Sequence, residues 1–218
     1  FLNELDQFIA EMYDYKSEHY RTKAPARFIV RYADDFVIVT RTEEDATVVK
    51  ELVREFLANL GLELSTEKTV ITHVEEGYDF LGFNIRRHAG RTFIQPSRMA
   101  LKKFRRAYKA RLELVIHKYG FSVQSIRYLN YLVRGWGNYY KWFSSKRAFK
   151  SLDNYIWWAN YRIALKFGGK KAPKRDTYLK RFLPMRLSSK ARERKYNSRQ
   201  FGVWIEEGKS AELIFRLD

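Results

Sequence analysis

Two adjacent aspartates, Asp34 and Asp35, stand between two short apolar runs at residues 28–32 and 36–39. Carboxylates this close raise each other's pKa unless a cation neutralises them. Mg²⁺ takes oxygen ligands and keeps several waters, so that a few carboxylates suffice to bind it. Two such ions, about 3.5 to 4 Å apart, catalyse phosphoryl transfer onto a 3′-hydroxyl. The pair therefore predicts metal-dependent phosphoryl transfer, and the simpler alternative is a polar turn.

The residues on both sides of the pair predict a β-hairpin with the aspartates at its tip. Residues 28–32 and 36–39 are mostly Phe, Ile, Val and Tyr, which favour strands. A hairpin at the surface usually alternates apolar and polar residues, and these runs do not. We therefore expect both strands to be buried, and a buried hairpin that presents paired acids needs a functional reason.

The elements around the hairpin follow an α+β pattern. Apolar residues at helical spacing predict a helix over residues 1–16, and residues 23–25 predict a loop. A second helix is expected from a cap at Thr42 to Leu60, with Gly61 after its end. Short strands are expected near residues 62–64, 69–74, 78–86 and 91–95, with turns at Glu76-Gly77 and Ala89-Gly90.

A helical region follows the boundary that Pro96 and Ser97 mark. Helices are predicted at residues 98–119, 123–143 and 147–167, with Gly120, Ser122 and Gly168-Gly169 at their ends. Residues 170–199 are rich in Lys and Arg and are expected to be mostly loop, and residues 201–218 to contain short strands. The predicted domains are therefore residues 1–96, 97–169 and 170–218.

The charge is unevenly distributed along the 218 residues. The net charge is +17, but residues 1–97 hold 12 Lys and Arg against 17 Asp and Glu, a net of −5. Residues 98–218 hold 30 against 8, a net of +22. A field of this sign attracts polyanions, so nucleic acid or an anionic membrane surface is the expected partner of the second part.

Two absences in the sequence narrow the class of protein. The chain has no cysteine, which excludes disulfides and Cys-ligated metal sites and agrees with a reducing compartment. No apolar run approaches the roughly 20 residues that a transmembrane helix needs, and residues 1–6 lack the basic, apolar and cleavage segments of a secretory signal. We therefore expect no membrane insertion.

Residues 28–39 resemble the catalytic hairpin of reverse transcriptases, whose Tyr-x-Asp-Asp element is here Tyr32-Ala33-Asp34-Asp35. In that family the element holds metal-binding carboxylates on the polymerase palm. The resemblance implies that Asp34 is a Mg²⁺ ligand and that Asp35 is a second ligand or a close supporter. It also implies that Tyr32 and Ala33 face the primer terminus and that the intact active site holds two Mg²⁺ ions.

Two further elements occur in the order and spacing of the same family. Residues 62–69 resemble the stretch ending in Lys-Thr, which implies that Lys68 lies near the phosphates of the incoming nucleotide; a solvated turn is the alternative. Phe80-Leu81-Gly82-Phe83 resembles the element that grips the primer strand. Its alternative is a core strand with a bulge at Gly82, and we expect one packed strand to do both.

Residues 129–140 resemble the thumb, or maturase region, of group II intron proteins. The implied fold is a partial reverse-transcriptase palm, an antiparallel sheet with helices, followed by a three-helix thumb and a short basic extension that binds DNA. Gly135 and Gly137 within a helix cost about 1 kcal/mol each relative to Ala. Close approach of another helix or of an RNA backbone would offset this cost, and a plain kink is the alternative.

Basic residues crowd the first thumb helix, where no acid occurs before Glu113. Solvated helix faces usually mix both signs of charge, so phosphate is the expected counter-charge. Most of the aromatic residues interleaved with these cations are expected in the core, and a minority to stack on bases. The residues expected to contact nucleic acid in this part are Arg98, Lys102, Lys103, Arg105, Arg106, Arg134 and Trp136.

The resemblance implies an RNA-directed DNA polymerase that binds its own intron RNA, assists its splicing and copies RNA into cDNA. The implied partners are intron RNA, an RNA template with a DNA primer, target DNA and dNTPs, in a ribonucleoprotein of the bacterial cytoplasm or of an organelle. A non-catalytic RNA-binding splicing factor is one alternative. A reverse transcriptase of a CRISPR or diversity-generating system is another.

One part of the expected catalytic set is missing from this sequence. The family needs a further carboxylate from an earlier palm strand, and the only aspartates before Tyr32 are Asp6 and Asp14, both on the predicted first helix. The chain does not begin with Met and reads as part of a longer protein. We therefore expect it to be inactive alone and to need the N-terminal fingers and palm portion of the same protein.

Overall fold

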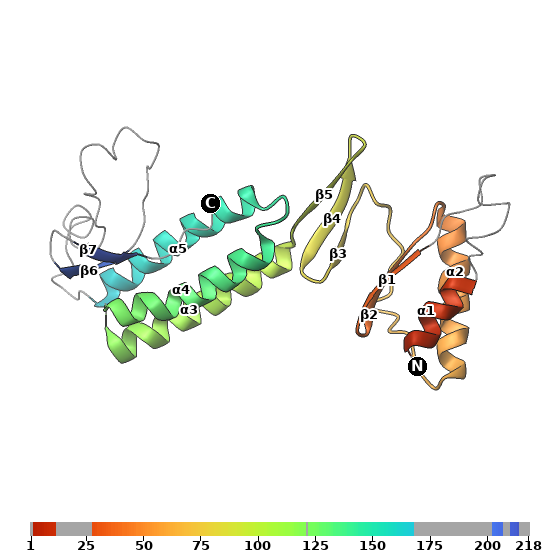
Figure 1. The fold of residues 1–218 in the computed structure, drawn as a ribbon, viewed down its shortest axis with the longest axis horizontal. Helices are drawn as coiled ribbons and strands as arrows, with labels where there is room; N and C mark the ends of the chain where they lie inside the picture. The colour runs from red at the N-terminus through yellow and green to blue at the C-terminus, as the bar shows by residue number, and fades with distance from the viewer. Residues whose placement is uncertain (1, 12–27, 121, 168–201, 207–209, 214–218) are drawn as a thin grey trace. The chain divides into compact units, whose positions relative to one another are not determined.

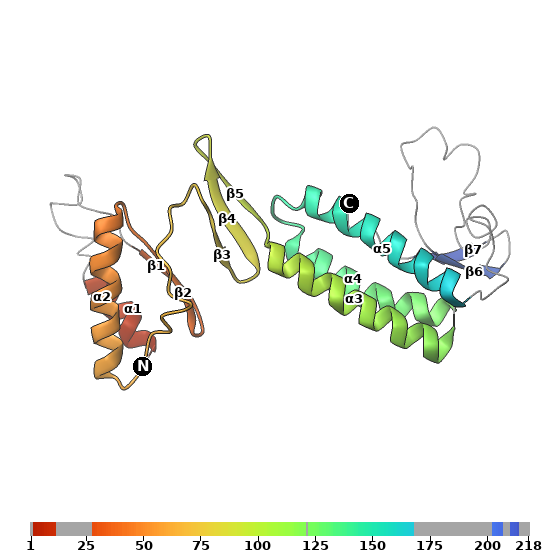
Figure 2. The same cartoon turned by 180° about the vertical axis from the view of Figure 1, so that it is seen from behind.

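The computed structural model of the protein describes residues 2–11, 28–120, 122–167, 202–206 and 210–213 (Figures 1 and 2). The fold is α+β with antiparallel sheets. It divides into two compact units, Phe1–Phe93 and Ile94–Asp218. Among the helices that the structure describes, none has both the length and the apolar character needed to cross a bilayer.

The core of the first unit lies between two helices and a hairpin. Helix α1, Leu2–Glu11, places Leu5 and Ile9 against α2, Glu43–Asn59, which contributes Val49, Val53 and Leu57. These five side chains are at most 6% exposed. The rings of Phe8 and Phe56 stack at 4.2 Å between the same two helices. The apolar stripe predicted for each helix is therefore the face that packs, and residues 12–16 of the predicted first helix lie outside the described residues.

The bounds of α2 follow from its end residues, as predicted. The Thr42 side chain accepts a hydrogen bond from the backbone N–H of Asp45 at 3.1 Å, and three acids occupy the first turn, where they interact favourably with the helix dipole. At the other end, Gly61 has φ +74°, a conformation that glycine adopts at little cost after a helix. The predicted cap and stop are both confirmed.

The predicted hairpin is confirmed, but the prediction that both its strands are buried is wrong. Strands β1, Phe28–Tyr32, and β2, Asp35–Val39, pair antiparallel with Tyr32 opposite Asp35. Ile29, Phe36 and Ile38 pack on the core of α1 and α2. The opposite face is exposed: Phe28, Val30 and Tyr32 are 46%, 47% and 67% exposed. The reason is that α1 and α2 cover only one face of this two-stranded sheet.

The strands predicted at residues 62–64 and 69–74 are absent from the structure. Instead the Ser65 carbonyl oxygen accepts hydrogen bonds from the backbone N–H groups of Lys68 and Thr69 and from the Thr69 hydroxyl. These local bonds satisfy groups that a strand would offer to a neighbour, and so they compete with sheet formation. The following apolar residues are exposed, with Val70 at 72%. A β-rich composition without a pairing partner therefore does not make a strand here.

Residues 78–86 form two strands instead of one. Strand β3, Tyr78–Phe80, turns into β4, Phe83–His88, which pairs with β5, Arg91–Pro96. Leu81 and Gly82 have φ of +50° and +81°, the pattern of a two-residue type I′ hairpin turn. Gly82 therefore marks a tight turn and not a bulge. The predicted turn at Ala89-Gly90 is confirmed, with φ of +49° and +74°.

Three helices form the core of the second unit, as predicted. They are α3, Arg98–Tyr119, α4, Val123–Tyr140, and α5, Lys146–Phe167. Ser97 and Ser122 cap the first two, and Gly120 follows α3 with φ +62°. Helix α4 ends at Tyr140 and not at residue 143, because the backbone N–H of Ser144, which would bond the Tyr140 carbonyl oxygen in a longer helix, donates to the Ile94 carbonyl oxygen at 2.8 Å.

A buried polar contact joins α3 to α5 inside this core. Tyr108 and Asn160 are both 0% exposed, and Nδ2 of Asn160 donates to the Tyr108 hydroxyl oxygen at 2.7 Å. The same nitrogen donates to the Ile156 carbonyl oxygen at 2.7 Å. Burial raises the pKa of the Tyr108 hydroxyl, which therefore stays neutral. The contact links α3 and α5 by a polar pair within the core, between residues 52 apart in the sequence.

The last described elements are strands β6, Gly202–Glu206, and β7, Ser210–Leu213, which pair antiparallel next to α4. They confirm the predicted short strands within residues 201–218. The loop predicted at 170–199 and the loop predicted at 23–25 lie outside the described residues.

Replacing Tyr108 by Phe tests the buried contact. We expect the free energy of unfolding to fall by about 1 to 2 kcal/mol, because a buried hydrogen bond is lost while the ring is kept. Urea denaturation followed by circular dichroism measures this change. The matched control is Tyr131→Phe, whose ring is 74% exposed and whose loss of a hydroxyl should change stability little. Equal effects of the two substitutions would contradict the role given to Asn160.

Candidate functional site

The two aspartates lie at the turn of the β1–β2 hairpin. Ala33 and Asp34 form the two-residue turn, and Asp35 begins β2 opposite Tyr32. Both carboxylates are exposed. Because side chains alternate along a strand, Asp35 shares the outer face of the hairpin with Tyr32 and Val30, away from the helices. The turn therefore presents one acid at its tip and one beside the exposed apolar face.

The turn itself is strained. Ala33 has φ +52° and Asp34 does not have a positive φ, a pattern typical of a type II′ turn, in which the first central residue is usually Gly. A non-glycine residue in the left-handed region is uncommon and persists where the surrounding structure determines it. The turn that carries the aspartates is thus held in a conformation that its own sequence does not favour.

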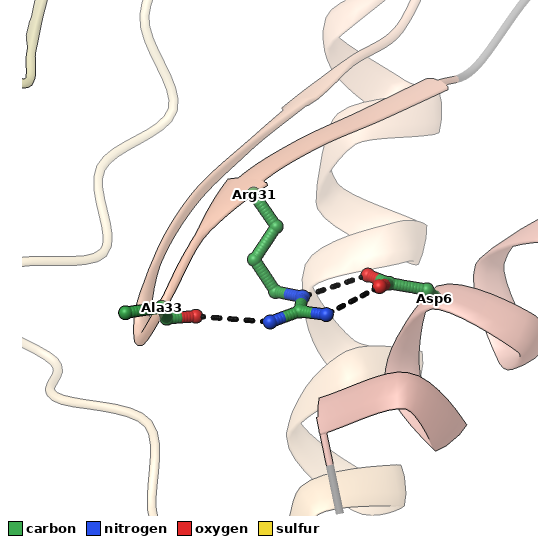
Figure 3. A network of polar contacts seen from close by, with 3 residues as sticks. All are labelled: Asp6, Arg31 and Ala33. Carbon is green, nitrogen blue, oxygen red and sulfur yellow. Dashed lines mark hydrogen bonds and ion pairs between the residues drawn. The ribbon is translucent and has the colours of Figure 1, made fainter.

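Arg31 joins this turn to helix α1 (Figure 3). Its Nε donates to Oδ1 of Asp6 at 2.9 Å, and its Nη2 donates to Oδ2 of the same carboxylate. Its third nitrogen, Nη1, donates to the Ala33 carbonyl oxygen at 3.3 Å. The Arg31 side chain is 18% exposed and that of Asp6 is 40% exposed. The hydrogen bonds from Arg31 hold the pKa of the Asp6 carboxyl below its usual value, so the pair is ionised at neutral pH.

The chemistry of Asp34 and Asp35 fits part of a magnesium site. Carboxylate oxygens are hard ligands, and Mg²⁺ binds through one or two of them while it keeps waters and takes substrate phosphates. Across the described part of the chain, no group of three or more His, Asp or Glu side chains converges. Any further protein ligand would therefore come from outside these residues.

The other predicted residues of the first unit occupy two separate turns. Lys68 is exposed in the turn that follows Ser65. Phe80 and Phe83 face each other across the first and last positions of the β3–β4 turn, whose central residues are Leu81 and Gly82. All three turn residues from Phe80 to Gly82 are half-buried. Their roles toward primer and nucleotide stay predictions.

Most of the predicted basic residues on α3 are exposed. Arg98, Lys102, Lys103 and Arg106 lie on the solvent side of the helix. Arg105 differs, because its Nη2 donates to Ser151 Oγ at 2.9 Å and its guanidinium lies 5.7 Å from the centre of the Tyr155 ring. The Tyr155 hydroxyl also donates to the Arg105 carbonyl oxygen at 3.0 Å. Arg105 therefore fastens α3 to α5.

Helix α4 places Trp136 and Arg134 on different sides. Trp136 is half-buried among Phe104, Tyr140 and Phe149, with ring centroids 4.3 to 5.9 Å away. It therefore belongs largely to the core where the three helices meet. Arg134 is exposed, and α4 contains no acidic residue. Its exposed side carries Gln124, Arg127, Tyr131, Arg134, Gly135, Asn138 and Tyr139.

The two glycines of α4 differ in their surroundings. Gly137 is buried. Gly135 is exposed, and a Cβ added to it would meet no atom within 4 Å. No other helix approaches Gly135, so within the described residues its cost is not offset by packing. Approach of an RNA backbone at this position stays a prediction.

Comparison with known families gives two matches to separate parts of the chain. The family described as reverse transcriptase (RNA-dependent DNA polymerase) matches residues 1–85, which include both aspartates. The group II intron maturase-specific domain matches residues 101–182, which include α4. Together the two matches and the similarity to a group II intron-encoded protein support a group II intron reverse transcriptase/maturase. The predicted family is confirmed.

The chain also matches curated proteins over short stretches. Group II intron-encoded protein LtrA of Lactococcus lactis is 51% identical over 59 residues, 26% of this chain and 10% of LtrA. Protein YkfC of Escherichia coli is 39% identical over 69 residues, 31% of this chain and 18% of YkfC. The putative COX1/OXI3 intron 2 protein of Saccharomyces cerevisiae is 38% identical over 61 residues, 27% and 7% of the two chains. The aligned stretch thus covers less than a fifth of each relative.

Sequence reasoning missed the ion pair between Asp6 and Arg31. Asp6 attracted attention only as an acid that did not match the missing catalytic carboxylate. The one available signal was that Arg31 is a charged residue among the apolar residues of β1, where a buried charge requires a partner.

Proposed function

We propose that this chain is the C-terminal part of a reverse-transcriptase palm followed by a thumb, in an RNA-directed DNA polymerase that copies RNA into cDNA. The observation that carries the proposal is the strained turn that presents Asp34 and Asp35, within the residues that match the reverse transcriptase family. Strain at an exposed acidic turn is typical of functional sites.

The proposal assigns a different role to each residue of the site. Mg²⁺ ions bound there would activate the 3′-hydroxyl and offset charge on the leaving pyrophosphate. Asp34 and Asp35 provide oxygen ligands, and Tyr32, exposed beside Asp35, faces the primer terminus together with Ala33. Lys68 contributes a cation near the nucleotide phosphates. Each of these roles follows from the family resemblance at the matching position.

The exposed outer face of the hairpin supports the need for more protein. Phe28 and Val30 are nearly half exposed on the same face as Asp35, and large apolar groups on a strand are usually covered. We infer that the fingers and earlier palm of the same protein cover this face and add the missing carboxylate. This chain alone would then incorporate no nucleotide.

The second unit is proposed as the nucleic-acid-binding thumb and maturase region. Its support is the match to the maturase-specific domain and the exposed cations of α3 and α4. Intron RNA and the template–primer duplex are the proposed ligands, and residues 170–218 are proposed to contact target DNA. Splicing assistance belongs to the same proposal, in a ribonucleoprotein of the bacterial cytoplasm or an organelle.

Replacing Asp34 by Asn in the complete protein tests the catalytic proposal. We expect primer extension to fall by at least about 100-fold, because removing a metal ligand costs more than disturbing its supports. Binding of intron RNA and splicing should persist. The matched control is Asp79→Asn, an exposed aspartate on β3 that bonds Asn84. Unchanged cDNA synthesis in the Asp34 variant would leave the non-catalytic splicing factor as the better description.

Replacing Leu81 by Asn separates stability from function at the β3–β4 turn. Asn is favoured at the first position of a type I′ turn, so the melting temperature should stay the same or rise. Primer extension should fall several-fold, because the apolar contact to the primer strand is lost. Ala89→Asn relieves the same strain at the exposed β4–β5 turn and should leave synthesis unchanged. A fall in both melting temperature and synthesis for the Leu81 variant would show a purely structural residue.

The salt dependence of binding tests the thumb surface. If exposed cations neutralise phosphates, log affinity for RNA falls linearly with log salt, by about 0.7 to 0.9 per phosphate contacted. Lys102→Gln and Lys103→Gln should each reduce that slope by roughly one contact. Arg105→Gln should instead lower the melting temperature with little change in slope, since its guanidinium bonds α5. Filter binding over a salt series measures the slopes. Slopes for all three variants equal to that of the unchanged protein would exclude α3 as the surface.

A further inference from the structure

The guanidinium of Arg31 connects two parts of the first unit that are far apart in sequence. Two of its nitrogens bond the Asp6 carboxylate on α1, and the third bonds the carbonyl oxygen of Ala33 in the turn. The guanidinium is planar and its donors have fixed directions, so binding Asp6 with one edge fixes where Nη1 points. Asp6 therefore sets the position of a donor that holds the turn.

The bond to Ala33 acts where the backbone is strained. Ala33 has φ +52° without a glycine in either central position of its turn. The turns at Leu81-Gly82 and Ala89-Gly90 also begin with a positive φ, and each has glycine at the second position. Asp34 occupies that second position in the hairpin of the aspartates and has no positive φ, so the strain of this turn lies at Ala33, where surrounding contacts must hold it.

The contact between Arg31 and Ala33 is made from the inner face of the hairpin, opposite to Asp35. Arg31 lies on the same face as Ile29, which packs on the α1–α2 core, whereas Asp35 lies on the opposite face. Arg31 therefore does not compete with ligands for the carboxylates. It contacts the turn through the Ala33 carbonyl, one residue before Asp34.

We propose that Arg31, oriented by Asp6, is a positioning residue that holds the Ala33–Asp34 turn in the conformation in which its carboxylates bind divalent metal. This inference rests on the proposed function. The ion pair joins β1 to α1, and in addition it orients Arg31 so that Nη1 donates to the Ala33 carbonyl oxygen. This third hydrogen bond is the one that holds the metal-binding turn.

Three variants of the complete protein separate the two roles of Arg31. Arg31→Lys keeps the positive charge but cannot bond Asp6 with two donors while a third reaches Ala33. Asp6→Asn keeps the shape of the partner and removes its charge. The exchange of both residues, Asp6→Arg with Arg31→Asp, restores an ion pair between α1 and β1, but a carboxylate at position 31 cannot donate to the Ala33 carbonyl. The matched control is Arg54→Lys, which alters the exposed Arg54–Glu51 pair on α2.

The decisive measurement is Mn²⁺ binding, followed by electron paramagnetic resonance, to the complete protein with primer, template and nucleotide. We expect Arg31→Lys and the exchanged pair to weaken Mn²⁺ binding about 10-fold, the usual effect of removing a support from a metal ligand. The affinity for primer and template should change less than twofold. The melting temperature should fall in Asp6→Asn and return toward the native value in the exchanged pair.

Two results would overturn the inference. The first is native Mn²⁺ binding and native primer extension in Arg31→Lys, and the second is recovery of metal binding together with the melting temperature in the exchanged pair. If the exchanged pair does not fold, the comparison of Arg31→Lys with Arg54→Lys decides alone. Asp34→Asn separates a failure of the proposed function from a failure of this inference. Native primer extension in the Asp34 variant would overturn the proposed function. Loss of primer extension in the Asp34 variant, with native Mn²⁺ binding and primer extension in Arg31→Lys, would overturn only this inference.

Discussion

The packing of one face of the β1–β2 hairpin against α1 and α2 is the constraint on which the candidate site depends. A two-stranded hairpin is marginally stable by itself in water, so the burial of Ile29, Phe36 and Ile38 provides its anchor. Alternation along the strands then directs Asp35 to the opposite face. The same packing brings Asp6 next to Arg31. The position of the acidic turn thus depends on an apolar core that does not include either carboxylate.

The helices were predictable from sequence because their ends are encoded locally. Thr42, Ser97 and Ser122 each accept a hydrogen bond from a backbone N–H in the first turn, and Gly61 and Gly120 have the positive φ that follows a helix. Strands depend on a partner elsewhere in the chain. Residues 62–74 have the composition of strands but make local turns and are mostly exposed, and residues 78–86 fold back on themselves at Leu81-Gly82. Composition alone does not distinguish a bulge from a turn at Gly82.

The candidate site shows the same division between local and distant information. The acidic turn follows from its motif and its flanking strands, which are adjacent in sequence. The pairing of Arg31 with Asp6 joins positions 25 residues apart, and no spacing rule connects a helix to a strand over that distance. Arg105 was indistinguishable from its basic neighbours until its bonds to Ser151 and Tyr155 were seen. Trp136 likewise belongs mostly to a ring cluster that only the packing of three helices creates.

The three turns with a positive φ at their first position suggest how strain is distributed in this part of the molecule. Ala89 and Leu81 are each followed by glycine, which lowers the cost of the second position. Ala33 is followed by Asp34, which has no positive φ, so the strain of this turn lies at its first position, where glycine would fit more easily. The hydrogen bond from the Arg31 side chain to the Ala33 carbonyl oxygen stabilises this conformation and needs no change in either side chain of the turn. The contact that stabilises the turn is thus made at the Ala33 carbonyl oxygen and involves neither carboxylate.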